Sequence, residues 1–266
     1  NSIPAENDMK PQPTEPAYGQ FNWENADKIA NFCRSNGIKL RGHCLMWHAQ
    51  IGKWMYQDEK GNLVSKEKLF QNMKHHITAI MERYKDVVYA WDVVNEAISD
   101  GGRPVMGQKP SPYRNSPLYQ IAGDEFIKKA FIYAREADPN VLLFYNDYNA
   151  ADPQKRDRIY NMVKSMKEEG VPIDGIGMQG HYNIYGPSME DVDAALTKYS
   201  TIVKHIHITE LDIRANEEMG GHLNFSREAG DISQTVKLLQ EDQYTRLFKI
   251  LRKHKDVVDN VTFWNL

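Results

Sequence analysis

The sequence has few cysteines and no long apolar run. Its 266 residues contain only Cys33 and Cys44, too few for a disulfide framework and without the spacing of a metal site, so we expect two buried free thiols. No stretch reaches the roughly 18–20 apolar residues of a membrane span. The formal net charge of −3 leaves no basic surface of the kind that binds nucleic acid. Internal repeats and low-complexity segments are also absent from the sequence.

The two ends lack the features of natural termini. Residues 1–4 carry neither the charged region nor the apolar region of a signal peptide. The last residues, 261–266, stop inside an apolar run without a polar tail. We therefore expect both ends to be cuts within a longer chain.

Helical and extended patterns alternate along the chain with little interruption. Amphipathic spacing predicts helices over residues 21–36, 65–84, 126–137, 153–169, 188–199 and 233–253. Their expected limits include Ser65 and Ser188 as N-caps and Gly37 as a stop. Between them, strands are expected at residues 38–42, 87–95, 141–146, 173–180, 202–211 and 261–264, with a stub at 1–4.

The expected strands are almost continuously apolar and alternate with amphipathic helices, which favours a parallel sheet buried on both faces. No strand is followed by a Gly-x-Gly-x-x-Gly pattern, so a dinucleotide-binding fold is not supported. Polar residues gather where the strands end, as in a (β/α)8 barrel. We predict an α/β chain of the TIM-barrel class forming one domain over residues 1–266. Residues 99–116, rich in glycine and proline, are expected to form a loop on the active face.

Two of these strands end in a carboxylate that has no basic neighbour. Residues 91–96 end at Glu96, and residues 207–212 contain Glu210. Glycoside hydrolysis needs such a pair, one carboxyl as the acid and one as the nucleophile or base. Asn95 could bind a sugar 2-hydroxyl, and Asp212 and His181 could orient the nucleophile. The alternative, two surface or helix-capping glutamates, does not explain their positions at strand ends.

The nine histidines raise a second hypothesis, that of a metallohydrolase. His205 and His207 lie on one strand, and His43 and His48 could add further ligands. Strand alternation argues against it, because if Glu210 points into the barrel, His205 and His207 should point towards the helices. We expect neither a metal nor a cofactor.

Seven motifs together carry a family resemblance. In order, they occupy residues 6–10, 41–48, 91–96, 145–149, 179–181, 209–212 and 261–264. In this combination the sequence resembles glycoside hydrolase family 10, the endo-β-1,4-xylanases, over its whole length. Asp8 and Cys44 depart from the commoner residues of the motifs. The resemblance also implies that the first strand and helix of the barrel precede Asn1, and that a second tryptophan of the cleft follows Leu266.

The resemblance implies a retaining hydrolysis of xylan and xylo-oligosaccharides, with Glu96 as acid/base and Glu210 as nucleophile. A retaining mechanism places the two carboxyl groups about 5–5.5 Å apart, rather than at the ~6.5–9.5 Å of inverting enzymes. The residues implied to support catalysis or bind the sugars are Glu6, Asn7, Lys10, His43, Trp47, Gln50, Asn95, Asn146, Tyr148, Gln179, His181, Asp212 and Trp264.

Two other functions remain open at this point: a β-1,4-glucanase of similar fold, and a xylan-binding barrel without catalysis. Xylan is too large to enter a cell, so the resemblance implies a secreted, cell-surface or periplasmic protein. Carbohydrate-binding modules attached outside this chain would suit such a substrate.

Overall fold

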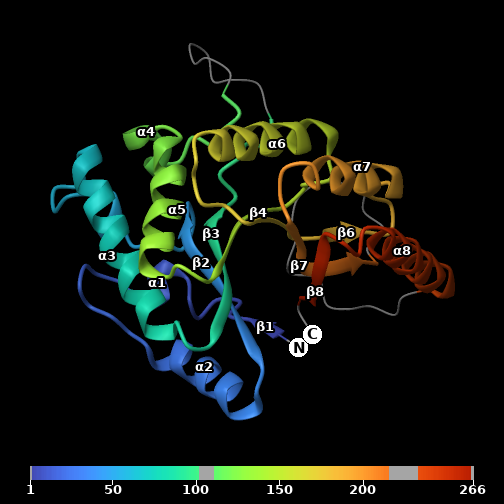
Figure 1. Ribbon diagram of the computed structural model, residues 1–266, viewed down its shortest axis with the longest axis horizontal. Helices are drawn as coiled ribbons and strands as arrows, with labels where there is room; N and C mark the ends of the chain where they lie inside the picture. The colour runs from blue at the N-terminus through green and yellow to red at the C-terminus, as the bar shows by residue number, and fades with distance from the viewer. Residues whose placement is uncertain (1, 102–110, 216–232, 265–266) are drawn as a thin grey trace.

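The computed structural model describes residues 2–101, 111–215 and 233–264. A parallel sheet curls into a nearly closed barrel (Figure 1). Its strands, in spatial order, are β1 (Ser2–Pro4), β2 (Lys39–Trp47), β3 (Val88–Asn95), β4 (Leu142–Asp147), β5 (Gly175–Met178), β7 (His205–Arg214) and β8 (Val258–Phe263). A short strand, β6 (His181–Asn183), pairs with the far end of β7.

The barrel is nearly closed between β1 and β8. These two strands pair only with β2 and β7 within the described residues. A side-chain hydrogen bond spans the gap, from Asn260 Nδ2 on β8 to Ser2 Oγ on β1 at 3.0 Å. The strands β1 and β8 accordingly lie near each other (Figure 1). The predicted TIM-barrel class is confirmed; whether the protein continues beyond either end stays a prediction.

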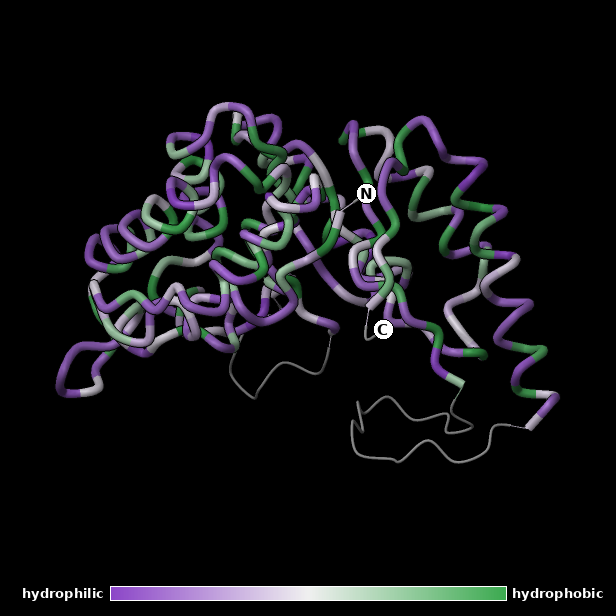
Figure 2. The backbone as a smooth tube through the Cα atoms, turned by 90° about the horizontal axis from the view of Figure 1, so that it is seen from below, coloured by the Kyte–Doolittle hydropathy of each residue, from purple (hydrophilic) through white to green (hydrophobic). Residues whose placement is uncertain are grey.

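Helices follow the strands and cover the barrel. They are α1 (Pro11–Thr14), α2 (Glu24–Asn36), α3 (Lys66–Tyr84), α4 (Pro117–Ala122), α5 (Glu125–Ala137), α6 (Pro153–Glu168), α7 (Met189–Tyr199) and α8 (Gln234–Lys253), with a 3-10 turn, η1 (Lys53–Met55). Hydrophobic and hydrophilic segments alternate along them (Figure 2). No helix within the described residues is long and apolar enough to cross a membrane.

Most predicted elements and helix ends are confirmed. Ser65 and Ser188 cap α3 and α7 by accepting backbone hydrogen bonds from Lys68 and Asp191, and Gly37 ends α2 in the left-handed conformation. The predicted strand 38–42 was too short, since β2 continues to Trp47. The elements α1, α4 and β6 were not predicted because three to six residues are too few to show a period.

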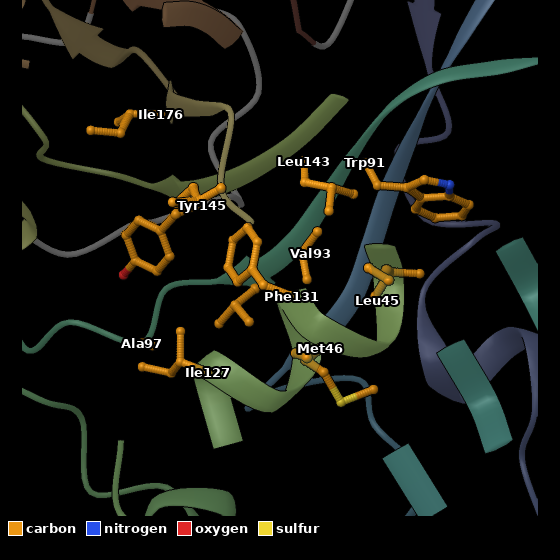
Figure 3. Close-up of a cluster of buried hydrophobic side chains, with 14 of the residues drawn as sticks. Leu45, Met46, Trp91, Val93, Ala97, Ile127, Phe131, Leu143, Tyr145 and Ile176 are labelled. Carbon is orange, nitrogen blue, oxygen red and sulfur yellow. The ribbon is translucent and has the colours of Figure 1, made fainter. Parts of the chain in front are cut away.

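The main core lies between the barrel and its helices. Ile127 and Phe131 of α5 point towards Val93 of β3 and Leu143 of β4 (Figure 3). Because Val93 and Leu143 face the helices, the adjacent residues Asp92 and Phe144 face the barrel interior, where both contact Arg41. The free thiols of Cys33 and Cys44 are both buried, as expected.

The barrel interior is polar and contains a charged cluster that crosses it. Arg41 of β2 contacts Asp92 of β3 at 2.5 Å and His207 of β7 at 2.7 Å. Because β2 and β7 are not neighbours in the sheet, only the interior brings their side chains together. The prediction that His207 faces the helices was therefore wrong. Within the described residues no group of three or more His, Cys, Asp or Glu side chains could hold a metal ion.

The reason for this error is a break in strand register. The pairing of β7 with β8 shifts between Ile208 and Leu211, so the strict alternation that places His207 opposite to Glu210 does not hold. A similar shift occurs in β3 between Asp92 and Val94, just before Glu96. Such irregularities re-aim side chains near active sites. Here the shift in β3 precedes Glu96, and the shift in β7 contains Glu210.

Candidate active site

Both predicted glutamates lie at the end of the barrel where the strands finish. Glu96 directly follows β3 and has a φ of 57°, a left-handed conformation uncommon for a residue with a side chain. Glu210 lies within β7 and is 5% exposed. Glu96 is half-buried, so the carboxylate of Glu210 is enclosed and that of Glu96 is more open to solvent.

Glu210 is held by two donors. Asn146 Nδ2 donates to Oε1 at 3.0 Å, and His181 Nε2 lies 3.0 Å from Oε2. The other ring nitrogen of His181 lies 3.1 Å from Asp212 Oδ2. Burial alone would lower the pKa of His181, but its bonds to Asp212 and Glu210 outweigh burial and raise the pKa to about 9. The imidazolium therefore donates from both nitrogens at neutral pH, to Glu210 and to Asp212.

Glu96 also accepts two hydrogen bonds. Trp47 Nε1 donates to Oε2 at 2.8 Å, and Gln179 Nε2 donates to Oε1 at 2.9 Å. Its backbone carbonyl accepts from Arg114 Nε at 2.9 Å. The left-handed backbone at this position is thus fixed on both sides, by side-chain donors and by an arginine from the loop that follows β3.

Asn146 and Gln179 connect the two glutamates reciprocally. The backbone carbonyl of Asn146 accepts from Glu96 N at 2.9 Å, while its side chain reaches Glu210. The backbone carbonyl of Gln179 accepts from Glu210 N at 2.8 Å, while its side chain reaches Glu96. Both amides also donate to Asn95 Oδ1, at 3.0 and 3.2 Å. Four consecutive hydrogen bonds therefore join the carboxylates, and the predicted separation of ~5–5.5 Å stays a prediction.

The glycine at the centre of β5 makes room for this arrangement. A Cβ on Gly177 would lie 2.3 Å from Asn146 Oδ1 and 3.0 Å from Thr209 Cγ2. Thr209, which the motif contained but whose role was not predicted, donates to Asn146 Oδ1 at 2.7 Å. With its oxygen bound by Thr209, the amide of Asn146 must turn its nitrogen towards Glu210.

On one side of the pair, the structure brings together most of the residues predicted to bind sugar. Lys10 Nζ donates to Asn7 Oδ1 at 2.8 Å and lies 4.7 Å from the centroid of the Trp47 ring. His43 Nδ1 lies 2.9 Å from Asp92 Oδ2, and its ring is 6.0 Å from that of Trp264. The two remaining predicted residues have exposed side chains and a positive φ: Glu6 and Gln50.

On the other side lies Tyr148, together with residues that the sequence did not predict. Tyr148 OH donates to Asp100 and accepts from Arg114 Nη2 at 2.8 Å. Lys155 lies beneath its ring, 3.5 Å from the centroid. Asp100 and Arg114 come from the glycine- and proline-rich segment, and Lys155 from α6. No local pattern distinguishes these three from surface charges. Residues 102–110 of the predicted loop lie outside the described residues.

A parallel β/α barrel whose strand ends carry two glutamates, each fixed by polar side chains, is the architecture of a glycoside hydrolase. The chain matches the family model described as glycosyl hydrolase family 10 over residues 1–266. It is 60% identical to the endo-1,4-beta-xylanase/feruloyl esterase of Xylanibacter ruminicola, covering 100% of this chain and 38% of that protein. It is 40% identical to the endo-1,4-beta-xylanase of Geobacillus stearothermophilus, with 100% of this chain and 77% of that protein covered.

Comparison with solved structures also finds xylanases. A psychrophilic glycoside hydrolase family 10 endo-beta-1,4-xylanase superposes with a TM-score of 0.92 at 69% identity, covering 100% of this chain and 78% of that one. Xylanase XynB of Paenibacillus barcinonensis, crystallised with a conduramine derivative, superposes with a TM-score of 0.90 at 39% identity, covering 99% and 76%. The chain belongs to glycosyl hydrolase family 10.

Proposed function

We propose that the chain hydrolyses internal β-1,4-xylosidic bonds of xylan with retention of configuration, Glu96 acting as acid/base and Glu210 as nucleophile. The observation that carries this proposal is the reciprocal hydrogen bonding of the two glutamates through Asn146 and Gln179. It fixes two carboxyl groups towards one site while giving them different surroundings. The endo-1,4-beta-xylanases named above share the family and support the choice of substrate.

In the first step Glu96 gives its proton to the glycosidic oxygen as the bond from that oxygen to C1 breaks. Glu210 attacks C1 from the opposite face and forms a glycosyl ester. The enclosed Glu210 suits the nucleophile, because its hydrogen bonds to His181 and Asn146 hold its two oxygens in a fixed orientation. Glu96 suits the acid, because it is the more exposed of the two.

In the second step Glu96, now a carboxylate, takes a proton from water. The water oxygen attacks C1 on the face that the leaving group vacated, and Glu210 departs as a carboxylate. The two inversions give net retention. Trp47 and Gln179, which donate to Glu96, hold its two oxygens in position in this step.

The neighbouring residues divide the cleft into two sides. We assign Glu6, Asn7, Lys10, His43, Trp47 and Gln50 to the non-reducing side, with Trp264 as a wall at the cleaved sugar. Asn95 binds its 2-hydroxyl. Asn146 and Tyr148 belong to the leaving-group side. The contacts from Lys10 to Asn7 and Trp47 support a single polar surface on the first side.

The assignment of roles is tested by removing each glutamate. Glu210→Ala should abolish release of oligosaccharides from xylan. Glu96→Ala should still react with an aryl xyloside whose leaving group needs no protonation, and added azide should then yield the β-glycosyl azide. NMR of the wild-type products should show the β-anomer first. Glu82→Ala, an exposed glutamate of α3, is the control. An α-anomer as first product would contradict the retaining mechanism.

The same assays separate the alternatives. A β-1,4-glucanase would release more sugar from unbranched β-1,4-glucan than from xylan. A binding protein without catalysis would retain xylan in a gel-shift assay and release no oligosaccharide. We expect hydrolysis of xylan to be faster than hydrolysis of glucan, because the similar protein of Xylanibacter ruminicola and the psychrophilic enzyme of known structure are both named as endo-1,4-beta-xylanases.

We further propose that the protein acts outside the cytoplasm, in secreted, cell-surface or periplasmic form, because its polymeric substrate cannot enter the cell. Fractionation of the source cells should place xylanase activity outside the cytoplasmic fraction. Activity confined to the cytoplasm would contradict this location and indicate short xylo-oligosaccharides as the substrate.

The full-length protein is proposed to carry further modules, including ones that bind carbohydrate. Support comes from the Xylanibacter ruminicola relative, of which this chain covers 38%. Insoluble xylan should retain the full-length Glu210→Ala protein more strongly than it retains the same variant of residues 1–266.

A further inference from the structure

A lysine with no role in the reaction above is buried beside the leaving-group side. Lys155 is 1% exposed and lies in the first turn of α6, whose N-cap is Asp152. Lysine is almost never fully buried unless it is paired, and a cation is disfavoured near a helix N-terminus by the helix dipole. Neither burial nor the helix itself explains a lysine here, so its charge must serve its surroundings.

Two carboxylates from different segments surround the ammonium group. Nζ lies 2.9 Å from Oδ1 of Asp147, at the end of β4, and 2.7 Å from Oδ1 of Asp100, in the segment that follows Glu96. Asp147 is fully buried and accepts from Tyr145 OH at 2.5 Å, which makes it a fixed anchor. Asp100 is 40% exposed, so Lys155 ties an open segment to the rigid barrel wall.

The third contact of Lys155 is an aromatic ring. Nζ lies 3.5 Å from the centroid of Tyr148, a cation–π geometry. The hydroxyl of Tyr148 donates to Asp100, the same residue that pairs with Lys155. Arg114 then joins Tyr148 to the acid/base, since it donates to the Tyr148 hydroxyl and to the Glu96 carbonyl. Lys155 thus fixes both the face and, through Asp100, the hydroxyl of Tyr148.

We propose that Lys155 is a positioning residue for the sugar on the leaving-group side: it holds the Tyr148 ring and Asp100 in the orientation that this sugar requires. This inference rests on the proposed function, in which Tyr148 borders the leaving group. Lys155 itself does not touch the reacting atoms. The charge of Lys155 acts through Tyr148. Loss of Lys155 should therefore lower kcat/KM only for substrates that place a sugar on the leaving-group side.

Two substrates with the same non-reducing part test this. Xylotetraose places sugars on both sides of the cleaved bond, whereas β-xylobiosyl fluoride loses only fluoride. For Lys155→Met we expect kcat/KM on xylotetraose to fall about tenfold, with a change of less than about twofold on the fluoride. Lys164→Met is the matched control: Lys164 lies on the same helix, is 52% exposed, and is 3.8 Å from Glu168.

The inference depends on the ratio of kcat/KM on xylotetraose to kcat/KM on β-xylobiosyl fluoride. An equal loss on both substrates, or no loss on xylotetraose, would overturn it, because a merely structural lysine affects the whole site alike. The wild-type rates decide the proposed function separately: turnover of the fluoride without turnover of xylotetraose would overturn that function and leave no role for Lys155.

Two further variants guard against a folding defect. Asp100→Asn removes the partner that Lys155 and Tyr148 share, and lies in a more exposed segment. Asp100→Asn should also lower the ratio of kcat/KM on xylotetraose to kcat/KM on the fluoride. If Lys155→Met does not fold, this variant tests the inference in its place. In the background of Tyr148→Ala, Lys155→Met should have no further effect on xylotetraose, as expected for residues that act together. Additive losses would contradict a role through Tyr148.

Discussion

At the scale of single residues, the candidate site depends on side chains that each make two contacts at once. His181 lies between Glu210 and Asp212, and Asn146 between Glu210 and Asn95. A side chain with two partners has little rotational freedom, so the carboxylate that it contacts is held in place before a substrate arrives.

The protonation of His181 should be visible in the stability of the protein. Its pKa is raised from an ordinary 6.5 to about 9 by Asp212 and Glu210, despite burial. The charged form is therefore favoured in the folded state, and its contribution is complete below pH 6.5 and is lost as the pH rises to about 9. That contribution is about 3 kcal/mol. Urea unfolding at pH 6 and pH 9.5 should show this loss in the wild type.

The variant His181→Gln serves as the control for that measurement. It keeps a hydrogen-bonding side chain but cannot titrate, so its unfolding free energy should lack this pH dependence between 6.5 and 9. An equally steep decrease in the variant would assign the dependence to another group. Its kcat/KM should also be lower than that of the wild type at pH 6.

Removal of the Asn146 amide should impair the chemistry more than the fold. Asn146→Ala deletes the donor to Glu210, and a hydrogen bond to a charged group contributes about 1.5–3 kcal/mol. We expect kcat/KM on xylotetraose to fall by about 10- to 100-fold. Asn140→Ala, at an exposed position, is the control. A decrease of less than twofold in Asn146→Ala would show that His181 alone orients Glu210.

At the scale of elements, β5 shapes the site through its glycines, which leave room for the side chains of neighbouring strands. Its glycines face the interior, where Gly175 makes room for Phe144 and Gly177 for Asn146 and Thr209. The functional side chains next to these glycines come from β4 and β7, as with Asn146 and Glu210, and from Gln179 just after β5. A glycine here is required by close approach, not by an unusual backbone conformation.

The variant Gly177→Ala should therefore displace Asn146. The added methyl would lie 2.3 Å from Asn146 Oδ1, and overpacking of this kind costs about 1–3 kcal/mol. We expect a lower thermal midpoint and a loss of kcat/KM at least as large as that of Asn146→Ala. Gly186→Ala, where the new methyl would meet nothing within 4 Å, should change neither. Wild-type activity in Gly177→Ala would show that the amide tolerates movement.

At the scale of the whole molecule, charged side chains cross the barrel interior and join strands that are not neighbours. Arg41 of β2 contacts Asp92 of β3 and His207 of β7, and His207 Nε2 lies 2.7 Å from Asp259 of β8. Burial lowers the pKa of His207 to about 4, so the neutral ring donates to Asp259 and accepts from Arg41. Four strands are thereby joined below the site.

Loss of Arg41 should destabilise the barrel as a unit. Both Arg41 and Asp92 are 2% exposed or less, and removing one partner of a buried pair costs about 3–5 kcal/mol. Arg41→Met should lower the urea midpoint accordingly, while Arg34→Met, which breaks a surface pair with Asp86, should cost no more than about 1 kcal/mol. Adding Asp92→Asn to Arg41→Met should restore stability. Further loss in the double variant would contradict pairing as the cause.

The sequence by itself determined the class of fold, most element positions and the two glutamates. These follow from periodicity, capping residues and short motifs, which depend on neighbours only a few positions away. The caps at Ser65 and Ser188 and the position of Glu96 at the end of β3 are examples, whereas β7 continues past Glu210 to Arg214.

Only the tertiary structure decided how these residues meet. Gln179 reaches Glu96 across 83 positions of sequence and Arg41 reaches His207 across 166, contacts that exist only once the sheet has curved. The register shifts next to both glutamates changed which side chains face inward, so strict alternation failed at His207. Lys155 resembles a surface charge in the sequence, because its burial depends on Asp100 and Asp147, which the pairing of β3 with β4 brings around it.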